Sequence, residues 1–190
     1  MMRIISGEFG GRRLKAVPGR ATRPTTDKIK EAVFNIIGPY FNGGNALDLF
    51  AGSGGLGIEA ASRGMQQVVL VDRQYAAIKT IKANITVTKM PQRFRVIKAN
   101  AMHALHQLAA ENNKFDLVLL DPPYQQQKII ANMAALATQN LLATNAQLVC
   151  ETNAATVLPV QLPAFRQLRR QTYGTTAITI YQYGGTHSVS

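Results

Sequence analysis

The amino-acid sequence predicts an α/β fold in which a mostly parallel β-sheet ends in an antiparallel hairpin. Short apolar runs alternate with helical stretches between residues 46 and 150, a cadence typical of strand-helix-strand units in a parallel sheet. The last two apolar runs are separated only by Gly174-Thr175-Thr176, which is short enough for an antiparallel hairpin at the sheet edge. With 190 residues and 46% hydrophobic content, the chain can bury one substantial core.

The first 24 residues predict a small basic β-hairpin extension, and residues 25–190 predict the main domain. Residues 3–7 and 11–17 are the expected strands of the extension, joined through glycine-rich turns. Lys and Arg outnumber Asp and Glu by eight to two within residues 1–30. Because apolar positions alternate along the same stretch, we expect it to be folded rather than merely solvated.

A helix is predicted to follow Thr26 and to stop at Gly38-Pro39, because its apolar positions recur at helical spacing. Its opposite face is expected to carry Lys28, Lys30 and Glu31. The strands predicted beyond it are residues 46–50, 68–71, 94–97, 115–120 and 147–150, followed by the hairpin strands 165–173 and 177–183.

The net charge, the single cysteine and the three histidines limit the functions and binding sites that the sequence supports. A net charge of +11 is the electrostatic signature of a polyanion binder and favours nucleic acid as the partner.

Cys150 is the only cysteine, which excludes an intrachain disulfide and suits a reducing cytoplasm. His103 and His106 have no nearby carboxylate or thiol to complete a zinc site, so we expect no metal. No apolar run approaches membrane-spanning length, and we expect a cytoplasmic monomer without a membrane partner.

A glycine-dense turn at residues 52–57 follows the strand that contains Asp48. Glycines allow a tight turn and close approach of a ligand. Their spacing satisfies the dinucleotide fingerprint, and Asp72 follows Gly52 by 20 residues, where a ribose-binding acid belongs. The motif alone fits both NAD and S-adenosyl-L-methionine, but Asp48 favours the latter, whose amino-acid end carries an ammonium group. The cofactor-binding residues predicted from this segment are Asp48, Ala51, Gly52, Ser53, Gly54 and Asp72.

Two further features are predicted at the ends of strands. Asn100-Ala101 follows the third strand of the alternating region, where an amide and a backbone N–H could contact adenine, although Asn is equally common as a helix N-cap. Asp48, Asp72 and Asp121 lie in or directly after three other strands. Ligands of open α/β sheets bind beyond the carboxyl ends of the strands, so we expect these acids around one crevice.

The motif Asp121-Pro122-Pro123-Tyr124 predicts chemistry on an exocyclic base amine, whose lone pair is delocalised and must be pyramidalised before it can react. The Asp121 carboxylate and the Pro122 carbonyl offer acceptors for the two N–H bonds. Tyr124 offers an aromatic face for a base taken out of its stack. A rigid strand-ending turn is the alternative interpretation, but the upstream glycine loop and the basic chain favour catalysis.

With these motifs, nearly the whole sequence resembles the RsmD family of bacterial methyltransferases, which modify a guanine amine of 16S ribosomal RNA. The resemblance is carried by residues 3–7, 11–14, 23–27, 47–54, 59–64 and 121–124. It implies a seven-stranded, Rossmann-like class I methyltransferase fold, S-adenosyl-L-methionine as donor and S-adenosyl-L-homocysteine as product. The implied reaction is methylation of guanine N2 in 16S rRNA, within the 30S subunit or an assembly intermediate.

The resemblance also implies that the basic N-terminal segment faces RNA phosphates, which position a substrate without reading its sequence. The RNA-binding residues expected on this basis are Arg3, Arg12, Arg13, Lys15, Arg20, Arg23 and Thr25. Alternative functions stay open from the residues alone. They are a DNA adenine-N6 methyltransferase, a protein-glutamine methyltransferase, a non-catalytic rRNA-binding assembly factor and an NAD oxidoreductase.

Overall fold

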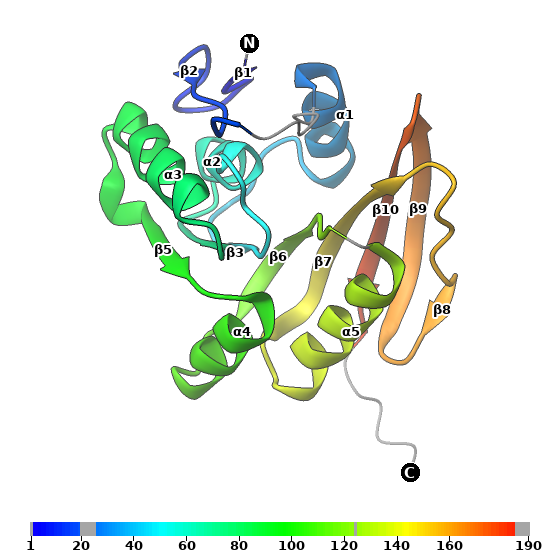
Figure 1. The fold of residues 1–190 in the computed structure, drawn as a ribbon. Helices are drawn as coiled ribbons and strands as arrows, with labels where there is room; N and C mark the ends of the chain where they lie inside the picture. The colour runs from blue at the N-terminus through cyan, green and yellow to red at the C-terminus, as the bar shows by residue number, and fades with distance from the viewer. Residues whose placement is uncertain (1, 20–25, 124, 185–190) are drawn as a thin grey trace. The chain divides into compact units, whose positions relative to one another are not determined.

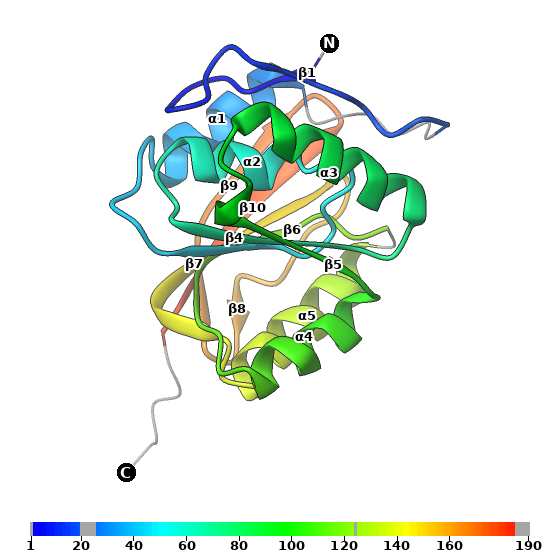
Figure 2. The same cartoon turned by 90° about the vertical axis from the view of Figure 1, so that its left-hand side faces the viewer.

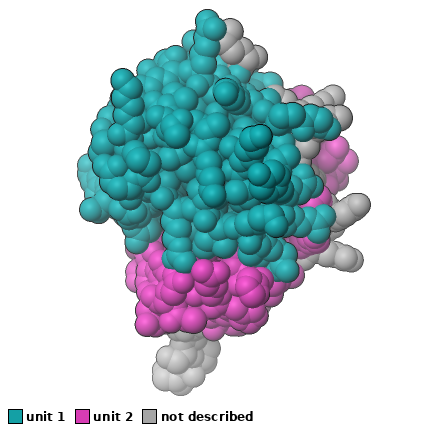
Figure 3. Space-filling model, turned by 60° about the vertical axis from the view of Figure 1, so that its left-hand side comes forward, with its two compact units in different colours: residues 1–100 teal, residues 101–190 magenta. Residues whose placement is uncertain are grey.

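Residues 2–19, 26–123 and 125–184 are described by a computed structural model of the chain. The predicted site residues Arg20, Arg23, Thr25 and Tyr124 lie outside the described residues. The chain divides into two compact units, residues 1–100 and 101–190, which are coloured separately in Figure 3. The fold is α/β with a mostly parallel central sheet and antiparallel C-terminal strands, as the sequence predicts.

The first unit is built on three parallel strands in the order β5-β4-β3. They are β3 (Asn45–Asp48), β4 (Gln67–Asp72) and β5 (Phe94–Lys98), connected through the helices α2 (Gly55–Ser62) and α3 (Tyr75–Thr88) and the 3-10 turn η1 (Pro91–Arg93). Every residue of β4 after Gln67 is buried, which matches the continuous apolar run expected of a strand covered on both faces. Leu47, Ile58 and Leu70 are fully buried in the core of this unit.

The N-terminal extension is folded onto the first unit, as predicted. Its strands β1 (Met2–Arg3) and β2 (Arg13–Leu14) pair antiparallel and are shorter than the sequence predicts. Ile4 and Phe9 between them are at most 1% exposed, so their burial fixes the extension in place. The Phe9 N–H donates to Ser62 Oγ at 2.9 Å, which ties the extension to the last residue of α2.

Helix α1 (Asp27–Ile37) begins after its N-cap Thr26 and ends at Gly38, as predicted. The expectation that Lys30 lies on the polar face is wrong, because its side chain is buried at 3% exposure. Its Nζ lies 3.6 Å from Glu59 Oε2 and donates to the Arg3 carbonyl. Burial lowers the pKa of Lys30, while the negative charge of Glu59 opposes that shift.

The second unit has the strand order β6-β7-β10-β9-β8, in which β6 and β7 are parallel and the other pairs are antiparallel. Its elements are α4 (Ala101–Ala110), β6 (Phe115–Leu120), α5 (Gln125–Thr138), β7 (Leu142–Asn153), β8 (Gln161–Leu162), β9 (Phe165–Tyr173) and β10 (Thr176–Tyr183), labelled in Figure 1. Strand β6 has the predicted bounds, whereas β7 is longer than the predicted strand 147–150 and β8 adds an edge strand. Within the described part of the chain, no helix is long and apolar enough to cross a membrane.

Candidate functional site

The carboxylates of the first unit stand at one edge of its parallel strands. Asp48 is the last residue of β3 and Asp72 the last residue of β4. Because β3, β4 and β5 are parallel neighbours, their carboxyl ends fall at the same edge. Asn100 follows the end of β5 by two residues, and the preceding Ala99 N–H donates to the Asp72 carbonyl at 3.1 Å. The structure therefore brings three of the predicted cofactor residues to adjacent strand ends.

The glycine loop is folded around these two carboxylates. Asp72 Oδ2 accepts from the Gly52 N–H at 3.0 Å, and Asp72 Oδ1 accepts from the Gln74 N–H at 2.9 Å. Asp48 Oδ2 accepts from the Gly57 N–H at 3.0 Å. Gly54 has φ +85° and caps α2, a conformation that side-chain-bearing residues rarely adopt. The acids and glycines predicted separately thus form one hydrogen-bonded loop.

Gly57 is the third glycine of the fingerprint Gly52-x-Gly54-x-x-Gly57, and it lies where helix α2 packs closely against β4. A Cβ atom added there would lie 2.6 Å from Leu70 Cδ2 on β4 and 3.2 Å from Asp48 Oδ2. The first distance is shorter than van der Waals contact permits, so helix α2 can lie this close to β4 only without a side chain at this position. The close packing also allows the Gly57 N–H to reach Asp48.

The electrostatics of the loop suit a ligand that is cationic and rich in hydroxyl donors. The side chains of Asp48 and Asp72 are 3% and 7% exposed, so their charges are screened less than those of surface acids. A carboxylate has about four acceptor positions, of which backbone N–H groups use two on Asp72 and one on Asp48. The N-terminus of α2 presents N–H groups that suit a ligand carboxylate.

Asn84 is a residue of this site that sequence reasoning missed. It is fully buried on α3 and donates from Nδ2 to the Ser53 carbonyl at 2.8 Å and to the Lys15 carbonyl at 2.9 Å. Its Oδ1 accepts from the Lys15 N–H at 2.8 Å. One amide therefore ties the glycine loop to the N-terminal extension. An available signal was an amide within the buried stripe that includes Ile81 and Ile85, where a polar side chain needs partners.

Asp121 lies in the second unit, directly after β6. All residues of β6 except Asp116 are buried, Asp121 is exposed and Pro122 is buried again. Pro122 therefore fixes the backbone where the chain leaves the core, since its ring sets φ and provides no N–H donor. Asp121 is therefore an exposed carboxylate at the end of a buried strand.

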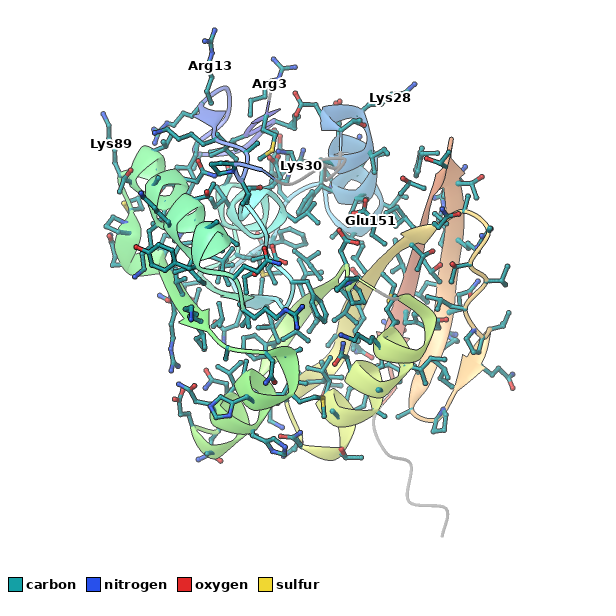
Figure 4. The ribbon with its side chains drawn as sticks, in the orientation of Figure 1. Arg3, Arg13, Lys28, Lys30, Lys89 and Glu151 are labelled. Atoms are coloured by element: carbon teal, nitrogen blue, oxygen red, sulfur yellow. The ribbon has the colours of Figure 1, made fainter. Side chains whose placement is uncertain are left out.

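The predicted RNA-binding residues of the extension differ in their surroundings. Arg3 is exposed, although its Nε lies 3.0 Å from Asp27 Oδ2. Arg12 donates from Nη1 to the carbonyls of Val87 and Thr88 at 2.9 and 2.8 Å, at the C-terminus of α3. Lys15 and Arg13 are exposed, and Figure 4 shows Arg3 and Arg13 pointing away from the ribbon.

Arg12 therefore holds the extension to α3 by satisfying carbonyls that a helix end leaves unpaired. Its guanidinium group also lies 5.4 Å from the centre of the Phe9 ring. Across the residues that the structure describes, no group of three or more His, Cys, Asp or Glu is placed to hold a metal ion.

Comparison with known proteins extends over almost the whole chain. A family model described as conserved hypothetical protein 95 matches residues 2–182. YlbH of Bacillus subtilis (strain 168) is 45% identical over 184 residues, covering 97% of this chain and 100% of that protein. Ribosomal RNA small subunit methyltransferase D of Escherichia coli (strain K12) is 33% identical over 182 residues, covering 95% of this chain and 89% of that protein.

Solved structures have the same class I methyltransferase fold. YhhF of Escherichia coli has a TM-score of 0.83 at 31% identity, covering 97% of this chain and 99% of that chain. The more distant SMU.776, solved in complex with SAH, has a TM-score of 0.63 at 13% identity and covers 82% of this chain and 48% of its own. The family model and the two relatives above 30% identity, each matched over nearly its whole length, show that the chain belongs to the RsmD family.

Proposed function

We propose that this protein transfers a methyl group from S-adenosyl-L-methionine to the exocyclic N2 amine of a guanine in 16S rRNA of the small ribosomal subunit. The observation that carries the proposal is the glycine loop hydrogen-bonded to Asp48 and Asp72 in a chain of the RsmD family. The 33% identical relative is named a ribosomal RNA small subunit methyltransferase, which supports rRNA as the substrate class.

The chemistry of the loop fits the donor group by group. Asp72 is assigned to the ribose hydroxyls, because a carboxylate accepts hydrogen bonds only and suits a pair of hydroxyl donors. Asp48 can accept from the ammonium group of the donor, and the N-terminus of α2 can receive its carboxylate. Asn100 and Ala101 are assigned to the adenine, as the sequence predicts. The SAH complex of SMU.776 supports a donor of this class for the fold.

The acceptor side is assigned to Asp121, Pro122 and Tyr124. S-adenosyl-L-methionine supplies a methyl group already activated as a sulfonium, so the chain mainly has to orient the amine in line with it. Acceptors at Asp121 and Pro122 hold the two N–H bonds and direct the nitrogen lone pair. In this transfer the nitrogen lone pair would form the N–C bond as the C–S bond breaks, S-adenosyl-L-homocysteine would leave, and the proton lost from the amine would pass to the Asp121 carboxylate. Tyr124 is assigned to stack on the guanine.

Methyl transfer itself tests the proposal. Labelled S-adenosyl-L-methionine is offered with naked 16S rRNA, 30S subunits and genomic DNA, the rRNA and the subunits being taken from cells that lack this enzyme. The label is then identified by nucleoside analysis, with N2-methylguanosine in rRNA as the expected product. N6-methyladenine in DNA would replace the proposal with a DNA methyltransferase, and the absence of label in all three substrates would contradict it.

Asp72→Asn is expected to weaken binding of S-adenosyl-L-homocysteine by roughly 10- to 100-fold, because hydrogen bonds to a charged group contribute about 1.5–3 kcal/mol. The amide keeps one acceptor oxygen, for either the Gly52 or the Gln74 N–H, so a control for the folding of the loop is needed. Isothermal titration calorimetry measures the affinity and a thermal melt measures the fold. Unchanged affinity at an unchanged melting temperature would remove Asp72 from the cofactor site.

A further inference from the structure

Of the stretches of the chain that lie between acidic residues, residues 73–110 carry the most basic side chains. Residues 73–110 carry seven Lys or Arg side chains and neither Asp nor Glu. The stretch begins directly after Asp72 and includes the whole of α3. A chain with ten acids therefore places none along this helix, so the charge of α3 cannot be balanced by neighbours on its own element.

The bases of α3 lie on one outward face. Tyr75, Lys79, Lys82 and Thr86 are exposed and follow one another at intervals of three or four residues, which places them on a single stripe. The opposite stripe, which includes Ile81 and Asn84, is buried against the unit. At a rise of about 1.5 Å per residue, the stripe runs for roughly 20 Å before the exposed C-cap Lys89.

The N-terminal extension continues this face. Strand β2 is held against α3 by the Asn84 amide, which bonds the Lys15 backbone, and by Arg12 on the carbonyls at the end of α3. Figure 2 shows the extension beside α3. In Figure 4 Arg13 and Lys89 both project outward from these neighbouring elements. We refer to Lys79, Lys82 and Lys89 together with Arg13 and Lys15 as the α3 face.

The nearby acids of the first unit form ion pairs with side chains outside the α3 face. Glu8 pairs with Arg93 at 2.7 Å and Asp27 pairs with Arg3 at 3.0 Å, while Glu59 is buried between Lys30 and Arg63. Among the residues that the structure describes, no ion pair involves a side chain of the α3 face. Five cations therefore stand together on a surface without compensating carboxylates.

We propose that the α3 face binds the sugar–phosphate backbone of the rRNA substrate; this inference rests on the proposed function. A row of cationic side chains suits a row of phosphates, and contacts of this kind position a nucleic acid without reading its sequence. A membrane surface fits less well, because the stripe offers Thr86 and a single aromatic residue, Tyr75, rather than apolar side chains that could insert.

The test compares two double variants that lose the same charge. K79A/K82A removes two cations of the α3 face, and alanine maintains the helix. R166A/R169A removes two exposed cations of β9 in the second unit and serves as the matched control. Affinity for 16S rRNA is measured between 50 and 200 mM KCl. Each lost phosphate contact lowers the slope of log K against log salt by about 0.7–0.9, so the wild type should lose about tenfold more affinity over this range than K79A/K82A.

The control is expected to keep the wild-type slope. An unchanged slope for K79A/K82A, or an equal change in R166A/R169A, would overturn the inference. Equal affinity and an equal slope change with a DNA duplex of matched length would overturn the assignment to RNA. The binding measurement needs no turnover, so it stays separate from the proposed function. The wild type and K79A/K82A could show the expected difference in slope while the wild type transfers no methyl group. That result would support the binding role of the α3 face and contradict the proposed function.

The steady-state kinetics of methyl transfer provide a second test of the α3 face. Because phosphate contacts position the substrate without touching the transferred methyl group, K79A/K82A should raise KM for rRNA and leave kcat unchanged. A fall in kcat at unchanged KM would place these lysines in the chemical step and would contradict a docking role.

Discussion

Asp121→Ala is expected to lower kcat for rRNA methylation by about 10²- to 10⁴-fold, the range typical of losing a group that orients and accepts a proton. Asp121 is exposed and stands directly after the buried strand β6, on a backbone that Pro122 fixes. Its loss removes an acceptor for the amine and leaves the glycine loop, with Asp48 and Asp72, intact. Affinity for S-adenosyl-L-homocysteine should therefore stay within about twofold of the wild type.

Two variants make this result specific. Asp116→Ala removes an exposed carboxylate from the same strand and should keep nearly full activity, which controls for the change in charge. Asp121→Asn retains one carbonyl acceptor and should be more active than Asp121→Ala. Single-turnover methyl transfer and calorimetry measure the two quantities. Loss of donor affinity in Asp121→Ala would reassign the residue to the cofactor site, and full activity would remove it from catalysis.

Glu59→Ala is expected to reduce the free energy of unfolding by about 3–5 kcal/mol, because it leaves buried cations without their counter-charge. Glu59 is fully buried, and its Oε1 accepts from Arg63 Nε at 2.8 Å, while Lys30 Nζ lies 3.6 Å from Oε2. The same carboxylate accepts from the N–H groups of Ile5 and Ser6 at 2.8 and 3.1 Å. The substitution therefore also releases the N-terminal extension.

Thermal unfolding should show the loss as a decrease of about 10 °C in Tm. Glu59→Gln keeps one of the two oxygens that accept from the Ile5 and Ser6 N–H groups. It should lose less stability than the alanine variant, and it remains measurable if that variant fails to fold. Glu31→Ala removes an exposed acid from α1 and should change stability by no more than about 0.5 kcal/mol. A loss below about 1 kcal/mol in Glu59→Ala would show that the buried cluster does not stabilise the fold.

Regular patterns in the sequence predicted much of the fold. The helical spacing after Thr26 and the Gly38-Pro39 stop predicted α1. Thr26 is the N-cap of this helix and Gly38 is its C-cap. The apolar run of residues 115–120 predicted β6 with the bounds that it has. Both succeed because burial follows the local period of the element. Strand β7 was predicted too short, since polar residues such as Asn145 interrupt its apolar pattern while the strand continues.

The conformation of the glycine loop was also predictable, because its residues are concentrated in short motifs. The N–H groups of Gly52 and Gly57 donate to the acids at the ends of β4 and β3, and Gly54 begins α2 at its N-cap. Whether Asp121 meets Asp48 and Asp72 around one ligand stays a prediction. The position of Tyr124 lies outside the described residues.

The sequence by itself determined the α/β class, the strand ends that carry the acids, and the glycine loop, because each depends on residues close together in the chain. Only the tertiary structure decided the roles of Lys30, Glu59 and Asn84. Apart from Arg63, which pairs with Glu59 from four residues away, their partners lie 27 to 69 residues away. Whether a charged or amide side chain is buried depends on what those distant partners offer. The local pattern of α1 therefore assigns Lys30 to the solvent-exposed face. Only the packing shows that Lys30 belongs to a buried ion pair.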